Sequence, residues 1–67
     1  MSKVKEAFDK IPIEEREWVF DEDGKWRHYR LFYNEKDDSI DLEVTNRYGD
    51  WVDCFEVTDE YLLKGEN

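Results

Sequence analysis

The chain has 67 residues and a formal net charge of −9, because 19 Asp and Glu residues outnumber 10 Lys and Arg residues. A field of this sign repels nucleic acids and anionic membranes and attracts basic protein surfaces. A chain of this length forms a single domain, residues 1–67, with a small core and little room for an enzyme pocket. Three Trp, four Tyr and four Phe residues nevertheless predict a folded domain rather than a disordered one.

The number of cysteines and the lengths of the apolar segments indicate the cellular compartment. Cys54 is the only cysteine, so no intramolecular disulfide can form, and a reducing environment fits best. No segment approaches the ~20 apolar residues of a membrane span, and Met1–Glu6 lacks the apolar run of a signal peptide. We therefore expect a cytoplasmic protein that does not bind membranes.

The first pattern along the chain is helical. Apolar residues recur with the spacing of one helical face at Val4, Ala7, Phe8 and Ile11. Ser2 is suited to cap the first turn, whereas Pro12 disfavours helical geometry in the residue before it. The spacing therefore predicts a short amphipathic helix over residues 2–11, with a further turn over residues 14–17 as an alternative to an irregular segment.

Beyond Pro12 the apolar residues follow a period of two, which is the pattern of strands. Four strands are expected, at residues 18–20, 26–33, 40–45 and 51–57. Turn-forming residues separate them, at residues 21–24, 34–39 and 46–50. The pattern predicts consecutive antiparallel strands.

The last predicted element is a helical turn over residues 59–64, capped by Thr58 and stopped by Gly65. Together the elements predict an α+β fold: an N-terminal helix packed on a four-stranded antiparallel β-meander, with a short C-terminal helical turn. The N-terminal helix is expected to cover the apolar face of the sheet.

Charge helps to choose the register of the two central strands. Pairing Tyr33 with Ile40 gathers the apolar residues on one face. The same register sets Arg30 opposite Glu43 on the second face, where the opposite charges attract. A slip by one residue would move every side chain to the wrong face.

The register of the last two strands depends on the loop that joins them. A four-residue loop at residues 48–51 sets Val44 opposite Phe55, and this register is preferred. A two-residue turn at residues 48–49 keeps the same faces but sets Asp53 against Val44.

No combination of residues supports catalysis. In the predicted sheet His28 and Cys54 lie two strand spacings apart, roughly 9–10 Å, which exceeds hydrogen-bond reach. Asp21–Gly24 resembles part of a calcium loop, but Val19 and Arg30 stand where that loop needs acidic residues, so a tight hairpin turn is the better interpretation. Phosphate-loop, dinucleotide and nucleophile-elbow strings are also missing. We expect a non-enzyme without catalytic residues, metal or cofactor.

One segment, residues 25–30, interleaves basic and aromatic residues as nucleic-acid-binding strands do. Acidic residues precede it at positions 21–23, and Asp41 and Glu43 follow on the neighbouring strand. The better interpretation is that these basic residues neutralise neighbouring acids. Direct binding of nucleic acid is not expected.

The second face of the predicted sheet carries large aromatic residues among charges, notably Trp26 and Phe32 beside Asp41 and Glu43. Exposed aromatics with a charged rim are typical of an interface centre. Two alternatives are that the C-terminal turn with Tyr61 covers this face, or that two copies of the chain pair through it.

In size, charge and aromatic content the whole chain resembles the small acidic inhibitors that phages and mobile elements make against restriction, CRISPR or repair enzymes, many of which imitate DNA. The resemblance rests on no motif and assigns no residue. It implies an inhibitor that occupies a basic, nucleic-acid-binding site on a host protein. We expect Trp26 and Phe32 to anchor such a partner and charge complementarity to come from Asp37, Asp38, Asp41 and Glu43. The alternative is a regulatory or structural module that dimerises or docks through its aromatic sheet face, with the charge serving solubility.

Overall fold

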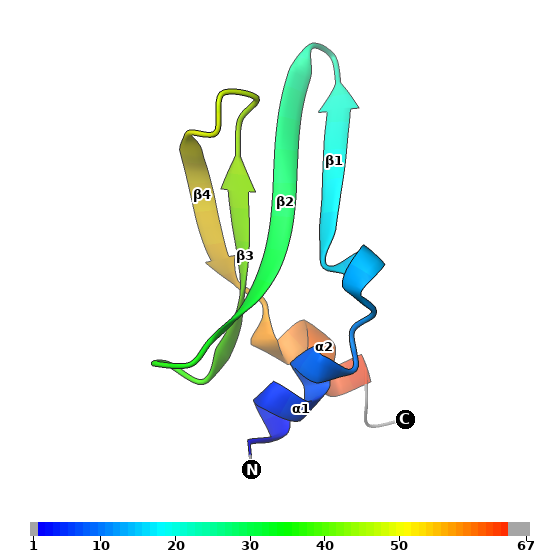
Figure 1. Cartoon of the computed structure of the whole chain (residues 1–67), viewed down its shortest axis with the longest axis vertical. Coiled ribbons are helices and arrows are strands. Elements are labelled where there is room, and N and C mark those ends of the chain that lie inside the picture. Colours follow the sequence, from blue (N-terminus) through cyan, green and yellow to red (C-terminus); the bar gives the residue numbers. More distant parts are fainter. Residues whose placement is uncertain (1, 65–67) are drawn as a thin grey trace.

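The computed structural model describes residues 2–64 and, within them, the side chains up to residue 62. The elements are α1 (Lys3–Asp9), the 3₁₀ turn η1 (Ile13–Glu15), β1 (Glu17–Glu22), β2 (Lys25–Asn34), β3 (Ser39–Thr45), β4 (Trp51–Glu56) and α2 (Thr58–Lys64). The strands form one antiparallel sheet in the order β1-β2-β3-β4, and both helices lie at the same end of it (Figure 1). The predicted α+β fold is therefore confirmed, while Gly65, the predicted stop of the last helix, lies outside the described residues.

Ser2 begins α1 as the sequence predicted. Its hydroxyl accepts hydrogen bonds from the backbone N–H groups of Val4 and Lys5, at 3.1 and 3.2 Å. These are two of the donors that the first turn of a helix leaves without a partner. Beyond Pro12 the chain forms η1, so a further turn is present, but it covers residues 13–15 rather than 14–17, and Glu17 already belongs to β1.

Arg16, the residue before β1, is hydrogen-bonded to the end of α1 and the residues that follow it. Its Nε and Nη2 donate hydrogen bonds to the carbonyl oxygens of Ile11 and Phe8, at 3.0 and 3.2 Å. Its guanidinium also lies over the Phe8 ring, 4.4 Å from the centroid. Phe8 O also accepts from Ile11 N–H at 3.0 Å, so Arg16 adds a second donor to that carbonyl. The two bonds from Arg16 fix α1 close to the start of the sheet.

A two-residue turn joins β1 to β2. Asp23 and Gly24 have φ angles of 55° and 76°, the left-handed values of a type I′ hairpin turn. The turn sets Glu22 opposite Lys25. It is the tight turn that the sequence predicted, although β1 is longer than the predicted strand at residues 18–20.

The register between β2 and β3 is the predicted one. Tyr33 lies opposite Ile40, and Arg30 lies opposite Glu43 on the other face. We call the face that carries Tyr33 and Ile40 the inner face, because the helices pack against part of it, and the opposite side of the sheet the outer face.

The preferred register between β3 and β4 is wrong. Val44 lies opposite Asp53 rather than Phe55, and the ladder shifts at Thr45, which pairs with Trp51. The preference came from keeping a carboxylate away from an apolar side chain. That argument fails because β4 is an edge strand whose residues are all exposed, so the Asp53 carboxylate stays in water.

The loop between β3 and β4 spans residues 46–50 and is organised by Asn46. Its side-chain carbonyl accepts hydrogen bonds from the N–H groups of Tyr48 and Asp50, at 2.9 and 3.0 Å. Gly49 takes a φ angle of 85°, which suits a residue without a Cβ. This closed loop, together with the irregularity at Thr45, produces the observed register.

The core lies where the helices meet the sheet. Ile11, Leu31 and Ile40 are buried there, and other apolar side chains pack against them, at Val4, Ala7, Phe8, Leu42, Val57 and Tyr61. Because Tyr61 belongs to this cluster, α2 lies on the inner side of the sheet. The alternative that Tyr61 covers the outer face is therefore wrong.

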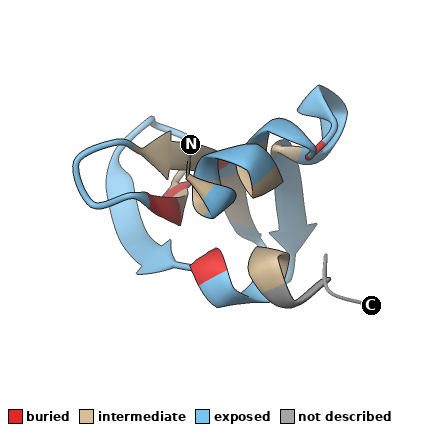
Figure 2. Ribbon diagram, turned by 90° about the horizontal axis from the view of Figure 1, so that it is seen from below, coloured by how far each residue is buried: buried red, intermediate tan, exposed pale blue. Residues whose placement is uncertain are grey.

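Contrary to expectation, the helices cover only one end of the inner face. Helix α1 has seven residues, about 10 Å at 1.5 Å per residue, whereas the ten residues of β2 extend about 33 Å. Strands β1 and β4 are exposed along their whole length (Figure 2). Within residues 2–64, no helix is long and apolar enough to cross a membrane.

Candidate protein-binding surface

The outer face brings three of the six predicted site residues together. Phe32 lies directly opposite Asp41, and Glu43 is the next residue of β3 on the same face. Glu43 also faces Arg30, with 3.8 Å between Oε1 and Nη2. Phe32 is half-buried, so part of its side chain remains accessible beside the two acidic residues.

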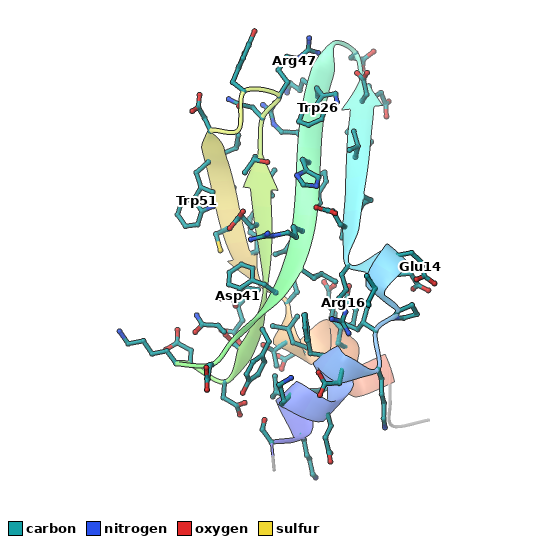
Figure 3. All side chains as sticks on the ribbon, in the orientation of Figure 1. Glu14, Arg16, Trp26, Asp41, Arg47 and Trp51 are labelled. Carbon is teal, nitrogen blue, oxygen red and sulfur yellow. The ribbon has the colours of Figure 1, made fainter. Side chains whose placement is uncertain are left out.

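Trp26 lies apart from this group. It shares the outer face with Phe32 but is six residues away along β2, about 20 Å; Figure 3 shows Trp26 and Asp41 toward opposite ends of the sheet. Trp26 is half-buried and lines a shallow depression with Arg27 and Arg47. The two predicted anchors therefore belong to separate surfaces, and Trp26 has basic neighbours.

Asp37 and Asp38 lie in the turn between β2 and β3, where they also have structural partners. The Asp38 carboxylate accepts a hydrogen bond from Ser2 Oγ at 2.5 Å and another from the Tyr33 hydroxyl. Both bonds, with that from Ser2 the stronger influence, lower the pKa of Asp38. Asn34 Nδ2 donates to Asp37 at 3.3 Å. These hydrogen bonds orient the carboxylates of Asp37 and Asp38.

The two acids of β3 have another acid beside them on β4. Asp41 lies opposite Glu56, and Glu43 lies opposite Cys54. Like charges directly opposite each other repel, although hydrogen bonds from Asn34 and Ser39 to Asp41, at 3.2 and 3.0 Å, hold that carboxylate in place. Sequence reasoning missed the pairing of Asp41 with Glu56, because it depends on the register between β3 and β4.

The pKa of Cys54 is affected by the same carboxylates. Partial desolvation raises the pKa of its thiol, and the carboxylates of Asp41, Glu43 and Asp53 raise it further. His28 does not offset this effect. Its Nε2 lies 2.9 Å from Glu17 Oε2, and in the register it faces Thr45 rather than Cys54.

Negative charge is concentrated on one half of the sheet. Residues 35–56, here called the acidic half, contain eight acidic and two basic residues, whereas residues 17–34 contain four acidic residues and three Lys or Arg. The acidic half comprises β3, β4 and the turns that precede them. In residues 2–64, no group of three or more His, Cys, Asp and Glu side chains is placed to hold a metal ion. The arrangement favours recognition of positive charge.

The inner face also presents apolar surface that sequence reasoning missed. Trp18, Phe20 and Phe55 keep 41%, 45% and 49% of their surface exposed, although Trp18 stacks on Tyr29 with 5.5 Å between the ring centroids. The signal available in the sequence was the length of the first helix, which is too short to cover these residues.

Comparisons of the chain with models of known protein families, with curated proteins and with solved structures gave no match. The surface of the protein itself therefore carries the argument about its function.

Proposed function

We propose that this protein is a non-enzymatic binding protein whose acidic half occupies a basic surface on another protein. The observation that carries this proposal is the charge polarity of the sheet, with eight acidic and two basic residues between positions 35 and 56. Complementary charge steers the encounter and selects partners of opposite sign. The fixed carboxylates of Asp38 and Asp41 support the proposal, because their positions are set before a partner arrives.

The partner that fits best is a nucleic-acid-binding protein. Grooves that hold nucleic acids are lined with Lys and Arg, and they attract phosphate charges spaced about 1.7 Å apart along a duplex. The protein is elongated, with extents of 40 × 26 × 17 Å, and presents carboxylates from two adjacent strands and a turn. Occupation of such a groove would exclude the nucleic acid, so the proposed activity is inhibition, with the carboxylates standing in for phosphates.

Competition with nucleic acid tests this proposal. Partners captured from a bacterial lysate at low salt would be eluted with increasing salt, identified and purified. We expect the protein to displace a labelled duplex from a purified partner in proportion to its concentration. A partner that binds this protein and the duplex at the same time would contradict the proposal.

Two variants of equal net charge localise the effect. The first neutralises the predicted acidic site through Asp37→Asn, Asp38→Asn, Asp41→Asn and Glu43→Gln. The control removes four charges elsewhere through Glu14→Gln, Glu15→Gln, Glu22→Gln and Asp23→Asn. We expect displacement to weaken at least about tenfold in the first variant, as for the loss of about 1.4 kcal/mol, and clearly less in the control. Equal losses would mean that net charge, and not this surface, determines binding.

A second candidate function is docking or dimerisation through an aromatic sheet face. The exposed rings of Trp18, Phe20 and Phe55 on the inner face favour it, because they present apolar surface that the helices leave uncovered. Sedimentation of the protein at increasing concentration tests the homodimer. A dimer that the Trp18→Ser variant dissociates would support this function, and a monomer at all concentrations would exclude self-association.

A further inference from the structure

Strand β4 has an open edge. Val57 N–H donates a hydrogen bond to Ile40 O at 2.8 Å, so the N–H of Val57 points toward β3. Because the backbone direction alternates along a strand, the N–H groups of Cys54 and Glu56 point away from β3, toward solvent. The N–H of Cys54 donates instead to the neighbouring Asp53 side chain, at 2.8 Å. The backbone of β4 is therefore available to another strand.

Natural proteins block such edges with lysine, proline, inward-pointing charges, bulges or a covering element. Asp53 is such an inward-pointing charge, opposite Val44, and it disfavours any added strand that brings no cation to it. Between Asp53 and Glu56, β4 contains no lysine or proline, and the only shift in its ladder lies at the opposite end, beside Thr45 and Trp51. All of its residues are exposed (Figure 2). Two aromatic residues of β4, Trp51 and Phe55, have side chains that are 67% and 49% exposed.

The charged residues around β4 determine which kind of strand can pair with it. Asp53 lies on the inner side of the strand, and Glu56 lies on the outer side next to Asp41. A shallow depression at the end of β4 is lined by residues 56–60, which add Asp59 and Glu60. Both sides of this edge are therefore acidic.

The other open edge, β1, lies in a different electrostatic environment. Its neighbour β2 contributes Lys25 opposite Glu22 and Arg30 opposite Glu17. Glu17 is also paired with His28. Basic side chains therefore stand beside the acids of β1, whereas β3 contributes none beside β4.

We propose that β4 binds an extended basic segment of the partner as a fifth strand of the sheet. This inference rests on the proposed function and specifies where and how the acidic half binds. In this mode a backbone carbonyl of the partner replaces the Asp53 side chain as the acceptor for Cys54 N–H, which frees the Asp53 carboxylate to pair with a cation. A second copy of the chain does not fit, because each copy carries a net charge of −9 and brings the same acids to the edge.

The positions of the side chains predict the sequence pattern of the bound segment. Asp53 and Glu56 are three residues apart and lie on opposite faces, with Phe55 between them. A strand running antiparallel to β4 places basic residues opposite both acids when it carries them at every third position. The residue opposite Phe55 is then apolar.

A ten-residue synthetic peptide, Lys-Val-Thr-Lys-Val-Thr-Lys-Val-Thr-Lys, fits this pattern and serves as the probe. The control peptide replaces each threonine with proline, which keeps the length, charge and valines but removes backbone donors and prevents regular strand pairing. We expect the full chain to bind the control at least about tenfold more weakly in titration calorimetry at low salt. Bound probe should also slow hydrogen exchange at the Cys54 and Glu56 amides.

Two proline variants distinguish the edges. Cys54→Pro removes an N–H that faces solvent and leaves the hydrogen bonds to β3 in place, so it blocks strand addition at β4. Val19→Pro is the matched control on β1, because Arg16 O accepts from Leu31 N–H at 2.7 Å, and the alternation then points the Val19 N–H outward. We expect at least about a tenfold loss of probe affinity in the first variant and less than about a twofold change in the second. Circular dichroism checks that each variant folds. If Cys54→Pro does not fold, the test of strand addition is whether bound probe slows hydrogen exchange at the Cys54 and Glu56 amides of the unaltered chain.

The outcomes separate this inference from the proposed function. Equal binding of both peptides, or a loss confined to Val19→Pro, would overturn strand addition at β4 while leaving charge-driven binding by the acidic half intact. Failure of the probe to bind also overturns the inference, whereas the competition with duplex decides the proposed function separately. A tenfold preference for the probe, together with slowed exchange at Cys54 and Glu56, supports strand addition.

Discussion

Cys54 is exposed, yet its surroundings disfavour the thiolate. Desolvation and the carboxylates of Asp41, Glu43 and Asp53 raise the pKa of its thiol above the ordinary value of 9.0. Since the thiolate is the reactive form, we expect iodoacetamide to alkylate Cys54 more slowly near neutral pH than it alkylates cysteine in an unstructured peptide.

The double variant Asp41→Asn and Glu43→Gln should accelerate this alkylation severalfold. As a control, Glu14→Gln and Glu15→Gln remove the same charge from η1, next to β1 at the opposite edge of the sheet, where Figure 3 labels Glu14. If both pairs of substitutions changed the rate equally, a local field from β3 would not be the cause.

Asp38 links the start of α1 to the turn before β3. Its pKa is lowered by the hydrogen bonds from Ser2 and Tyr33, so its ionised form stabilises the fold. This contribution is present above the unfolded pKa, near 3.8, and is lost as the pH falls through the lower folded value. Asp38→Asn should therefore unfold at lower urea concentration than the unaltered chain at neutral pH, and the difference should shrink below about pH 4. A difference that does not depend on pH would assign the effect to packing instead.

At the scale of elements, Thr58 joins α2 to the sheet. Its side chain is buried, and Oγ1 accepts the hydrogen bond of Ile40 N–H at 2.9 Å. In Thr58→Val the shape is kept but a buried donor loses its acceptor, so the free energy of unfolding should fall by about 1–3 kcal/mol. Thr58→Ser keeps the oxygen and should lose less. Urea unfolding of the two variants checks the order, and equal losses would show that the methyl group matters more than the hydrogen bond.

The elements also show what the sequence can predict. The Ser2 cap, the type I′ turn at Asp23 and the register of Arg30 with Glu43 follow from local rules and from one pair of charges. The register of β4 does not. Val44 pairs with Asp53, two residues from the preferred Phe55 and as in the alternative with the two-residue turn, and this pairing accompanies an irregularity at Thr45 that has no distinctive sequence pattern. Local patterns therefore determine the first three strands, while the last depends on the shape of a loop.

The candidate site was only partly predicted, for a different reason. The grouping of Phe32, Asp41 and Glu43 follows from the register of the central strands, which the sequence predicts. The separation of Trp26 from Phe32 was overlooked because both share one face. Their spacing of about 20 Å follows from counting residues along the strand.

At the scale of the whole molecule, one end holds a small core and the remainder is a sheet over which no described helix lies (Figure 1). The exposed edge strands β1 and β4 offer surface to partners, and the charge beside each strand determines which partners fit. Within the sheet, the excess of acidic residues lies in residues 35–56 and not in residues 17–34. This uneven distribution, rather than the net charge of −9, is the basis of the proposed inhibition.

The dependence of partner affinity on salt tests this account most directly. The dissociation constant of the purified basic partner would be measured between about 50 mM and 200 mM salt, for the unaltered chain and for the variant neutralised at Asp37, Asp38, Asp41 and Glu43. We expect the affinity of the unaltered chain to fall at least about tenfold over this range and the variant to show a shallower dependence on salt. An affinity that does not change with salt, or the same dependence in both proteins, would contradict it.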